Sequence, residues 1–162
     1  MTRREREVTD LNEILKILDT CKIVHVGLVD DGQPYVLPMC YGYTMDDGEL
    51  TLYLHGATTG YKLDVIRANP TACFEMECDV VPFEGEVACQ YGICYSSIIG
   101  RGTAEIITDV DEKKRALSII MKTQTEKDFT FDERMVSIVS VIEIHVSDYT
   151  AKRRPLPEGL RK

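Results

Sequence analysis

Six segments of the chain have the alternation of apolar and polar residues that is typical of β-strands. In Glu49–Leu54, for example, the three leucines fall on one face and the polar residues fall on the other. The turn sequences Asp30-Asp31-Gly32 and Asp46-Asp47-Gly48 separate the first three segments and predict antiparallel connections. The predicted strands are Lys22–Val29, Gln33–Tyr43, Glu49–Leu54, Thr71–Cys78, Gly92–Ile107 and Ser137–Tyr149.

Three segments have the periodicity of amphipathic helices. The first begins with Asp10, a capping residue that stands three positions before Glu13. Residues 79–90 follow neither period and predict an irregular, acidic loop. Six mostly antiparallel strands with flanking helices predict a mainly β fold, a small barrel rather than a doubly wound sheet. The predicted helices are Thr9–Thr20, Thr58–Arg67 and Asp109–Thr125.

Proline and glycine mark places where the strands depart from regular pairing. Pro34 and Pro38 cannot donate to a ladder, so each belongs at a strand start, an edge or a bulge. The backbone near Pro38 is therefore expected to lack a strand partner on one side. Gly100 and Gly102 predict a bulge or bend in the fifth strand, as closure of a barrel requires.

Length and composition indicate one domain, to which we assign residues 1–162. A chain of 162 residues with 44% hydrophobic composition builds one continuous core and is too short for two ordinary domains. The formal charge of −8 argues against nucleic-acid binding, which needs a basic surface. The charged start lacks the apolar run of a signal peptide, and no stretch reaches the length of a membrane span. We therefore expect a cytoplasmic protein.

The six cysteines are interpreted as free thiols, because a cytoplasmic location disfavours a disulfide framework. Four residues separate Cys73 from Cys78 and Cys89 from Cys94, so a metal site is an alternative. Structural zinc sites use tighter spacings, and the strand pattern places Cys73 and Cys78 on opposite faces. Small buried apolar side chains account for the cysteines better, and no metal site is predicted.

The segment Tyr53–Lys62 has the features of a phosphate-binding turn. A strand ends at His55, Gly56 and Gly60 bracket two threonine hydroxyls, and Lys62 falls in the first turn of the next helix. Glycines allow close backbone approach, and amide groups at a helix start attract anions. The alternative is an ordinary strand-to-helix turn, which the pattern alone does not exclude.

Two further segments, Gln33–Tyr43 and Tyr91–Gly100, combine extended backbone with tyrosines, hydroxyls and glycines. Such a surface suits a flat ring that lies against strand backbone. Packing and a dimer surface explain the same tyrosines when each segment is taken alone.

Taken together, the motifs resemble the nitroimidazole-resistance branch of the pyridoxamine 5'-phosphate oxidase-like flavoproteins over nearly the whole chain. The resemblance implies a six-stranded antiparallel split barrel, a homodimer, and FMN in a groove between the subunits, with FAD or haem in some relatives. It is carried by these motifs: Arg-Arg-x-Arg-Glu from Arg3, Asp-Asp-Gly-x-Pro-Tyr-Val-x-Pro from Asp30, Leu-His-Gly-Ala-x-x-Gly-x-Lys from Leu54, Ile-Arg-x-Asn-Pro from Ile66, Tyr-x-Ser-Ile-Ile-Gly-x-Gly from Tyr95 and Thr-x-Lys-Arg-Arg from Thr150.

The resemblance also assigns roles to residues. The backbone of one strand would lie along the flavin ring, the phosphate-binding turn would surround the phosphate or the ring edge, and the third motif would add hydroxyls. This branch usually has arginine where the chain has Ser96, which removes one phosphate-pairing charge. The implied cofactor-binding residues are Val36, Leu37, Pro38, Met39, His55, Gly56, Ala57, Thr58, Lys62, Tyr95, Ser96 and Ser97.

The function implied by the resemblance is reduction of a small aromatic or nitro acceptor with electrons from a nicotinamide donor. His55 is the candidate catalytic residue, as a proton donor or as a positional hydrogen-bond donor. His25 and His145 lie in strand patterns without a motif and are interpreted as structural. The alternative function is binding, storage or sensing of flavin or haem without turnover. Oxidation of pyridoxamine phosphate is disfavoured, because the basic residues that hold that substrate have no clear counterpart here.

Overall fold

The computed structural model describes residues 3–157 and 159; positions 1–2, 158 and 160–162 of the predicted domain lie outside the described residues. The strands are β1 (Glu7–Val8), β2 (Ile23–Asp30), β3 (Gln33–Asp46), β4 (Glu49–Gly56), β5 (Thr71–Phe83), β6 (Gly92–Ile107) and β7 (Ser140–Arg154). The α-helices are α1 (Leu11–Thr20), α2 (Tyr61–Ala68), α3 (Val110–Thr125) and α4 (Glu133–Ser137), with short 3-10 turns at Arg4–Arg6 and Ala88–Gln90.

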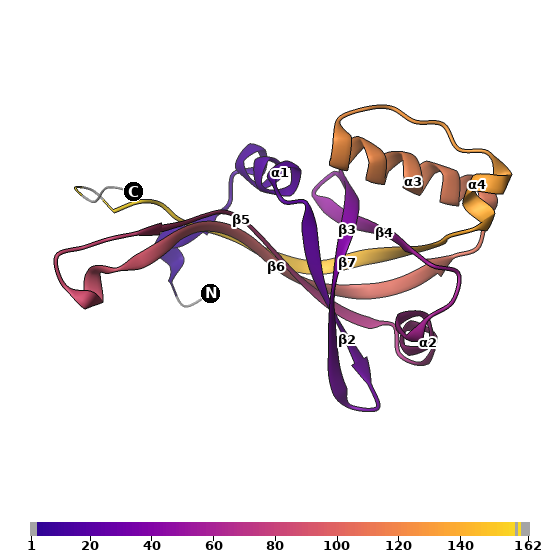
Figure 1. Ribbon diagram of the computed structural model, residues 1–162, viewed down its shortest axis with the longest axis horizontal. Coiled ribbons are helices and arrows are strands. Elements are labelled where there is room, and N and C mark those ends of the chain that lie inside the picture. Colours follow the sequence, from indigo (N-terminus) through magenta and orange to yellow (C-terminus); the bar gives the residue numbers. More distant parts are fainter. Residues whose placement is uncertain (1–2, 158, 160–162) are drawn as a thin grey trace.

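The strands form a closed antiparallel barrel. Their order is β1-β7-β4-β3-β2-β5-β6, and an additional pairing between β6 and β7 closes the ring (Figure 1). The predicted mainly β split barrel is confirmed, and β1 adds a two-residue strand that pairs with β7. The far parts of β5, β6 and β7 extend beyond the barrel as a long arm (Figure 1). In the described residues, no helix is long and apolar enough to cross a bilayer.

The helix starts follow local capping chemistry. The Asp10 side chain accepts a hydrogen bond from the Glu13 amide at 3.0 Å, and Asp109 accepts from the amides of Asp111 and Glu112. The second helix begins at Tyr61 rather than at the predicted Thr58. Gly60 precedes it with φ 145°, a backbone conformation that side chains disfavour, and residues 57–60 therefore form a loop.

Strand β5 continues to Phe83, so the prediction of an irregular segment over residues 79–90 is wrong at its start. The β5–β6 register shifts between Cys78 and Val81, and Asp79 takes a left-handed φ of 56°. This bulge breaks the alternation, which hid the remainder of the strand from the sequence pattern. Cys73 is exposed and Cys78 is buried, which confirms their placement on opposite faces.

The last predicted strand is displaced. Asp132 caps α4, which takes up residues 133–137, and β7 runs from Ser140 to Arg154 rather than from Ser137 to Tyr149. Its extension is paired with β6, up to Tyr95 opposite Arg154. The predicted bend in β6 is confirmed by a register shift between Arg101 and Gly102. A Cβ on Gly102 would lie 2.1 Å from the carbonyl oxygen of His145, so the bend admits glycine only.

Two hydrophobic clusters fill the fold. The larger one occupies the barrel and the inner faces of α1 and α2, with Leu52, Phe74 and Ile98 among its buried members. The smaller one lies beneath α3 and α4 and includes Tyr53 and Ile120. The helices thus cover apolar strand faces. The outer faces of β2, β5 and β6 carry polar side chains together with exposed apolar ones such as Ile23 and Ile99.

Replacing Glu13 with glutamine is expected to reduce stability at neutral pH but not at pH 2. The Glu13 carboxylate accepts hydrogen bonds from Lys16 at 2.5 Å and from Arg153 of β7 at 2.6 Å. These partners, Lys16 first, lower the pKa of Glu13 from 4.5 to about 2. Ionised Glu13 therefore stabilises the fold above pH 4.5, and this contribution is lost as the pH falls toward 2.

The measurement is the urea midpoint of unfolding, followed by circular dichroism between pH 2 and pH 7. The Glu49→Gln variant is the control, because Glu49 makes no ion pair in the part of the chain that the structure describes. If the difference in urea midpoint between Glu13→Gln and the wild type stays constant from pH 2 to pH 7, ionised Glu13 does not stabilise the fold.

Candidate functional site

One edge of β3 is open where the sequence places the ring-binding backbone. Residues 33–40 of β3 pair with β2, whereas β4 pairs only with residues 41–46. Val36, Leu37, Pro38 and Met39 therefore have a strand partner on one side only, as predicted for the backbone near Pro38. The Val36 side chain is 63% exposed. This stretch offers backbone donors and acceptors beside an accessible apolar surface.

The end of β4 and the start of α2 form a cradle that we define by His55, Gly56 and Lys62. The Lys62 ammonium lies over Gly56: a Cβ added to Gly56 would stand 2.9 Å from both Cε and Nζ of the lysine. Gly60 caps α2 without a side chain, so the first helical amides face the same loop. A cation, a bare backbone and a helix start thus meet at one place. Ala57 and Thr58 lie exposed in the loop between them.

The cradle adjoins the open edge of β3. The Tyr61 ring, next to Lys62 at the start of α2, packs edge-on against the Tyr35 ring of β3 with centroids 5.1 Å apart. The Tyr61 hydroxyl also donates a hydrogen bond to Asp30 of β2. Two segments that the alternation of apolar and polar residues does not connect are therefore neighbours in the fold.

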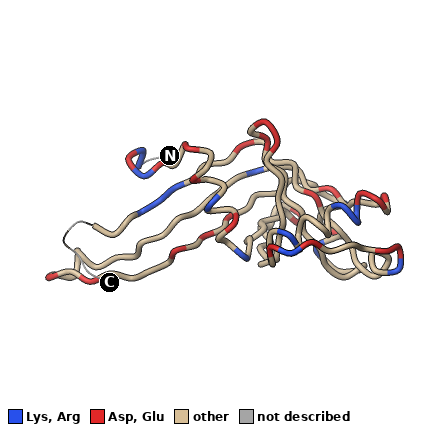
Figure 2. The backbone as a smooth tube through the Cα atoms, turned by 90° about the horizontal axis from the view of Figure 1, so that it is seen from above, with Lys and Arg blue, Asp and Glu red and all other residues tan. Residues whose placement is uncertain are grey.

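Tyr95 and Ser97 lie elsewhere, on the outer face of the arm. They line an open hollow of ≈ 550 Å³ together with Glu75, Glu77, Val80, Gly92, Ile93 and Arg154. The Lys152 ammonium stands 5.7 Å from the centre of the Tyr95 ring. The nearby positive charge of Lys152, with a smaller contribution from Arg6, lowers the pKa of Tyr95. Figure 2 shows the basic run of β7 along the arm and acidic residues at its tip.

The two groups do not meet within one chain. Both groups lie on strands that pair with β7. His55 of β4 lies opposite Val141 of β7, and Tyr95 of β6 lies opposite Arg154 of β7. Thirteen residues of extended strand span roughly 40 Å. A single cofactor therefore contacts both groups only if a second chain supplies one of them.

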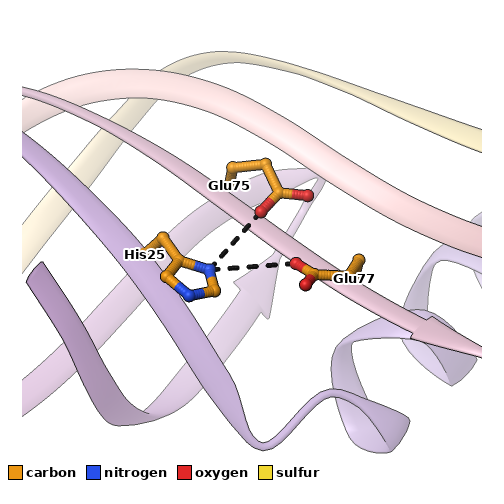
Figure 3. Close-up of side chains that lie close together, drawn as sticks. All are labelled: His25, Glu75 and Glu77. Carbon is orange, nitrogen blue, oxygen red and sulfur yellow. Dashed lines mark ion pairs between the residues drawn. The ribbon is translucent and has the colours of Figure 1, made fainter. Parts of the chain in front are cut away.

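A third cluster, formed by His25, Glu75 and Glu77, was missed by the sequence analysis (Figure 3). The imidazole Nδ1 lies 3.5 Å from Oε2 of Glu75 and 3.8 Å from Oε2 of Glu77. Burial, then the neighbouring Glu77, raises the pKa of Glu75 to about 7, against an opposing effect of His25. The spacing of Glu75 and Glu77 in one strand was visible in the sequence. The pairing of β2 with β5, which brings His25 opposite Glu75, was not.

A sequence model of the pyridoxamine 5'-phosphate oxidase family matches residues 10–153. The chain belongs to this family. A candidate 5-nitroimidazole antibiotic resistance protein from Bacteroides thetaiotaomicron is 32% identical, over 91% of this chain and 86% of that chain, with a TM-score of 0.76. The predicted resemblance is thereby confirmed. No curated protein matches the chain.

Two more distant structures share the fold of this oxidase family. The FAD and haem binding protein from Mycobacterium smegmatis is 19% identical, over 94% of this chain and 76% of that chain, with a TM-score of 0.79. An FAD-binding protein from Mesorhizobium loti is 20% identical, over 91% of this chain and 96% of that chain, with a TM-score of 0.62. At these identities the likeness concerns the fold alone.

Ser96, the position where the resemblance implied a missing arginine, has its side chain on the face opposite to those of Tyr95 and Ser97. It is 1% exposed and lies on the inner face, opposite Arg153. Arg153 Nε donates to the Ser96 hydroxyl at 3.0 Å, and that hydroxyl donates to Asp79 at 3.3 Å. A guanidinium therefore does lie beside position 96, contributed by β7. Its other end is bound to Glu13, so it serves the contact between α1 and the arm.

Proposed function

We propose that the protein is an FMN-binding oxidoreductase that holds its flavin between two copies of the chain. The observation that carries this proposal is the cradle of His55, Gly56 and Lys62 beside the open edge of β3. Membership of the pyridoxamine 5'-phosphate oxidase family supports it. The names of the Mesorhizobium loti and Mycobacterium smegmatis proteins, which record flavin binding, support it as well.

The residues fit the two ends of a flavin nucleotide. The Lys62 ammonium and the amides at the start of α2 suit a phosphate, and Gly56 leaves space that a Cβ would fill. The backbone of residues 36–39 has an unpaired edge for the polar rim of the ring, and Val36 gives an exposed apolar contact. Phosphate and ring would thus be recognised by adjacent elements of one chain.

A homodimer completes this site. Tyr95 and Ser97 line a hollow on the arm that lies far from the cradle of the same chain. A second copy, turned so that its arm lies along the first barrel, would bring its hollow to the cradle. The exposed apolar side chains Val36, Ile23 and Ile99 on β3, β2 and β6 suit burial between two copies.

A bound flavin would supply electron transfer from a nicotinamide donor to a small acceptor. The chain's own residues would place the reactants. Lys62 would fix the phosphate, and the strand backbone would fix the ring plane. His55, exposed at the end of β4, would orient the acceptor or give it a proton. The 32% identity with the Bacteroides thetaiotaomicron protein makes a nitroimidazole or a related nitroaromatic compound the first acceptor to test.

The test is the visible spectrum of the purified protein before and after incubation with FMN and gel filtration, with sedimentation of the same sample. We expect retained flavin bands and a dimer mass. NADH and NADPH oxidation is then measured with a nitroaromatic acceptor, using His55→Gln as a variant and His145→Gln as its control. Retention of flavin without any donor oxidation would establish the alternative, a binding or sensing protein. A colourless monomer after incubation would overturn the proposal.

A further inference from the structure

We propose that His25, Glu75 and Glu77 form a binding site for a divalent transition-metal ion on the outer face of the barrel. The site is distinct from the cradle of the same chain. Its two glutamates line the hollow that the proposed dimer would bring to the partner's cradle, so metal binding is tested on the flavin-free protein. It is built from one side chain of β2 and two of β5, whose arrangement is drawn in Figure 3.

The distances among the three side chains are those of ligands around an ion. Nδ1 of His25 is 3.5 Å from Glu75 Oε2 and 3.8 Å from Glu77 Oε2, and all three ligand atoms lie within 4.8 Å of one another. Direct N–H···O hydrogen bonds are shorter, about 2.7–3.2 Å. Bonds of about 2.0–2.2 Å to a tetrahedral zinc ion place the ligand atoms about 3.3–3.6 Å apart. Small side-chain adjustments therefore complete the coordination.

The barrel holds these ligands in place without the ion. His25 is directly opposite Glu75 in the β2–β5 ladder, and Glu77 follows on the same face of β5. Between the two glutamates, Met76 points inward and is fully buried, which fixes the local rotation of the strand. Ligands on paired strands keep their separation better than ligands on loops.

The chemistry of the cluster suits a cation. Two carboxyl groups face one imidazole, and neither glutamate forms an ion pair with lysine or arginine within residues 3–157. One nitrogen and two oxygens favour ions such as Zn²⁺ and Mn²⁺, since Mg²⁺ and Ca²⁺ prefer oxygen ligands alone. Soft ions are disfavoured because the cluster contains no cysteine among the described residues: Cys78 points to the opposite, buried face, and Cys73, exposed on the same strand, lies outside the group.

In a single chain the site opens into two hollows, so an ion would keep exchangeable positions. Glu75 and Glu77 line the hollow of ≈ 550 Å³ that also contains Tyr95, and His25 and Glu77 line a neighbouring one of ≈ 430 Å³. Three protein ligands leave at least one position of a tetrahedral ion free. A small anion or another oxygen-bearing ligand in the larger hollow would bind there.

Mn²⁺ is the probe for this site. Thiols are poor ligands for Mn²⁺, so the cysteines should not contribute to the measured binding. The flavin-free protein is titrated with MnCl₂, and free Mn²⁺ is measured by electron paramagnetic resonance. We expect one saturable site per chain. Its affinity should fall at least about tenfold in His25→Gln and in Glu77→Gln, since even outer partners of metal ligands are worth that much. Mg²⁺ at the same concentration should displace little Mn²⁺.

The matched controls come from a second histidine–glutamate pair. His145 Nε2 lies 3.5 Å from Glu143 Oε1, without a third ligand among the residues that the structure describes. His145→Gln and Glu143→Gln should leave Mn²⁺ binding unchanged, and circular dichroism verifies that all four variants are folded. Absence of saturable binding by the wild type would overturn the proposal. Equal binding by the wild type, His25→Gln and Glu77→Gln would overturn it too. Neither result would bear on flavin binding, which the visible spectrum tests.

Discussion

Replacing Phe74 with alanine is expected to lower the free energy of unfolding by about 3–5 kcal/mol. Phe74 is 1% exposed in the centre of the larger hydrophobic cluster. Its ring lies directly on β6, where a Cβ on Gly100 would stand 2.5 Å from two ring carbons. The paired strands on both sides prevent the backbone from closing the cavity that alanine leaves. Domains of this kind are stable by only about 5–15 kcal/mol, so the loss is a large part of the total.

The measurement is urea unfolding of the flavin-free protein, followed by circular dichroism. Phe129→Ala is the matched control, because that phenylalanine is 42% exposed and its removal should cost only about 1 kcal/mol. Similar losses in the two variants would show that the ring of Phe74 does not fill the barrel as described. The dependence of the unfolding free energy on urea concentration should be the same in both variants, which would show that both unfold from the same compact state.

Replacing Lys62 with alanine is expected to weaken FMN binding about tenfold to a hundredfold. A hydrogen bond to a charged group contributes about 1.5–3 kcal/mol, and about 1.4 kcal/mol corresponds to a factor of ten. The Lys62 ammonium is the charged group that lies over Gly56 in the cradle. The dissociation constant is measured by quenching of flavin fluorescence on titration with protein.

Two companion variants make this result specific. Lys127→Ala removes the same charge from an exposed position after α3 and should leave the affinity unchanged. Gly56→Ala should weaken binding in the same direction as Lys62→Ala, because its methyl group displaces the lysine from the cradle. If Lys62→Ala binds FMN as tightly as the wild type, the phosphate does not bind at Lys62. The family assignment would not change.

Local chemistry made much of the fold predictable. Asp10 and Asp109 begin their helices as expected, and the two Asp-Asp-Gly turns connect β2 to β3 and β3 to β4. Two of the errors arose where a single residue interrupts a periodic pattern. The left-handed Asp79 hides the last part of β5, and Gly60 delays the start of α2. Each was a departure of the backbone that a pattern of side chains does not record.

The candidate site was predictable in its pieces and not in its assembly. In the sequence, Gly56, Gly60 and Lys62 suggested a phosphate-binding turn, with an ordinary strand-to-helix turn as the alternative. The contact between Tyr35 and Tyr61, which brings the cradle to β3, depends on the tertiary structure. So does the face on which Ser96 lies, since its contacts with Arg153 and Asp79 join segments far apart in the chain.

The sequence by itself determined the features that depend on near neighbours: strand and helix periodicity, helix caps, turns, and the motifs that indicate the family. The tertiary structure decided strand order and register, because these follow from the packing of residues that are distant in the chain. Register alone puts His25 of β2 opposite Glu75 of β5 and creates their cluster with Glu77. Strand length alone separates Tyr95 and Ser97 from Lys62, and so makes a second copy of the chain necessary for a shared site.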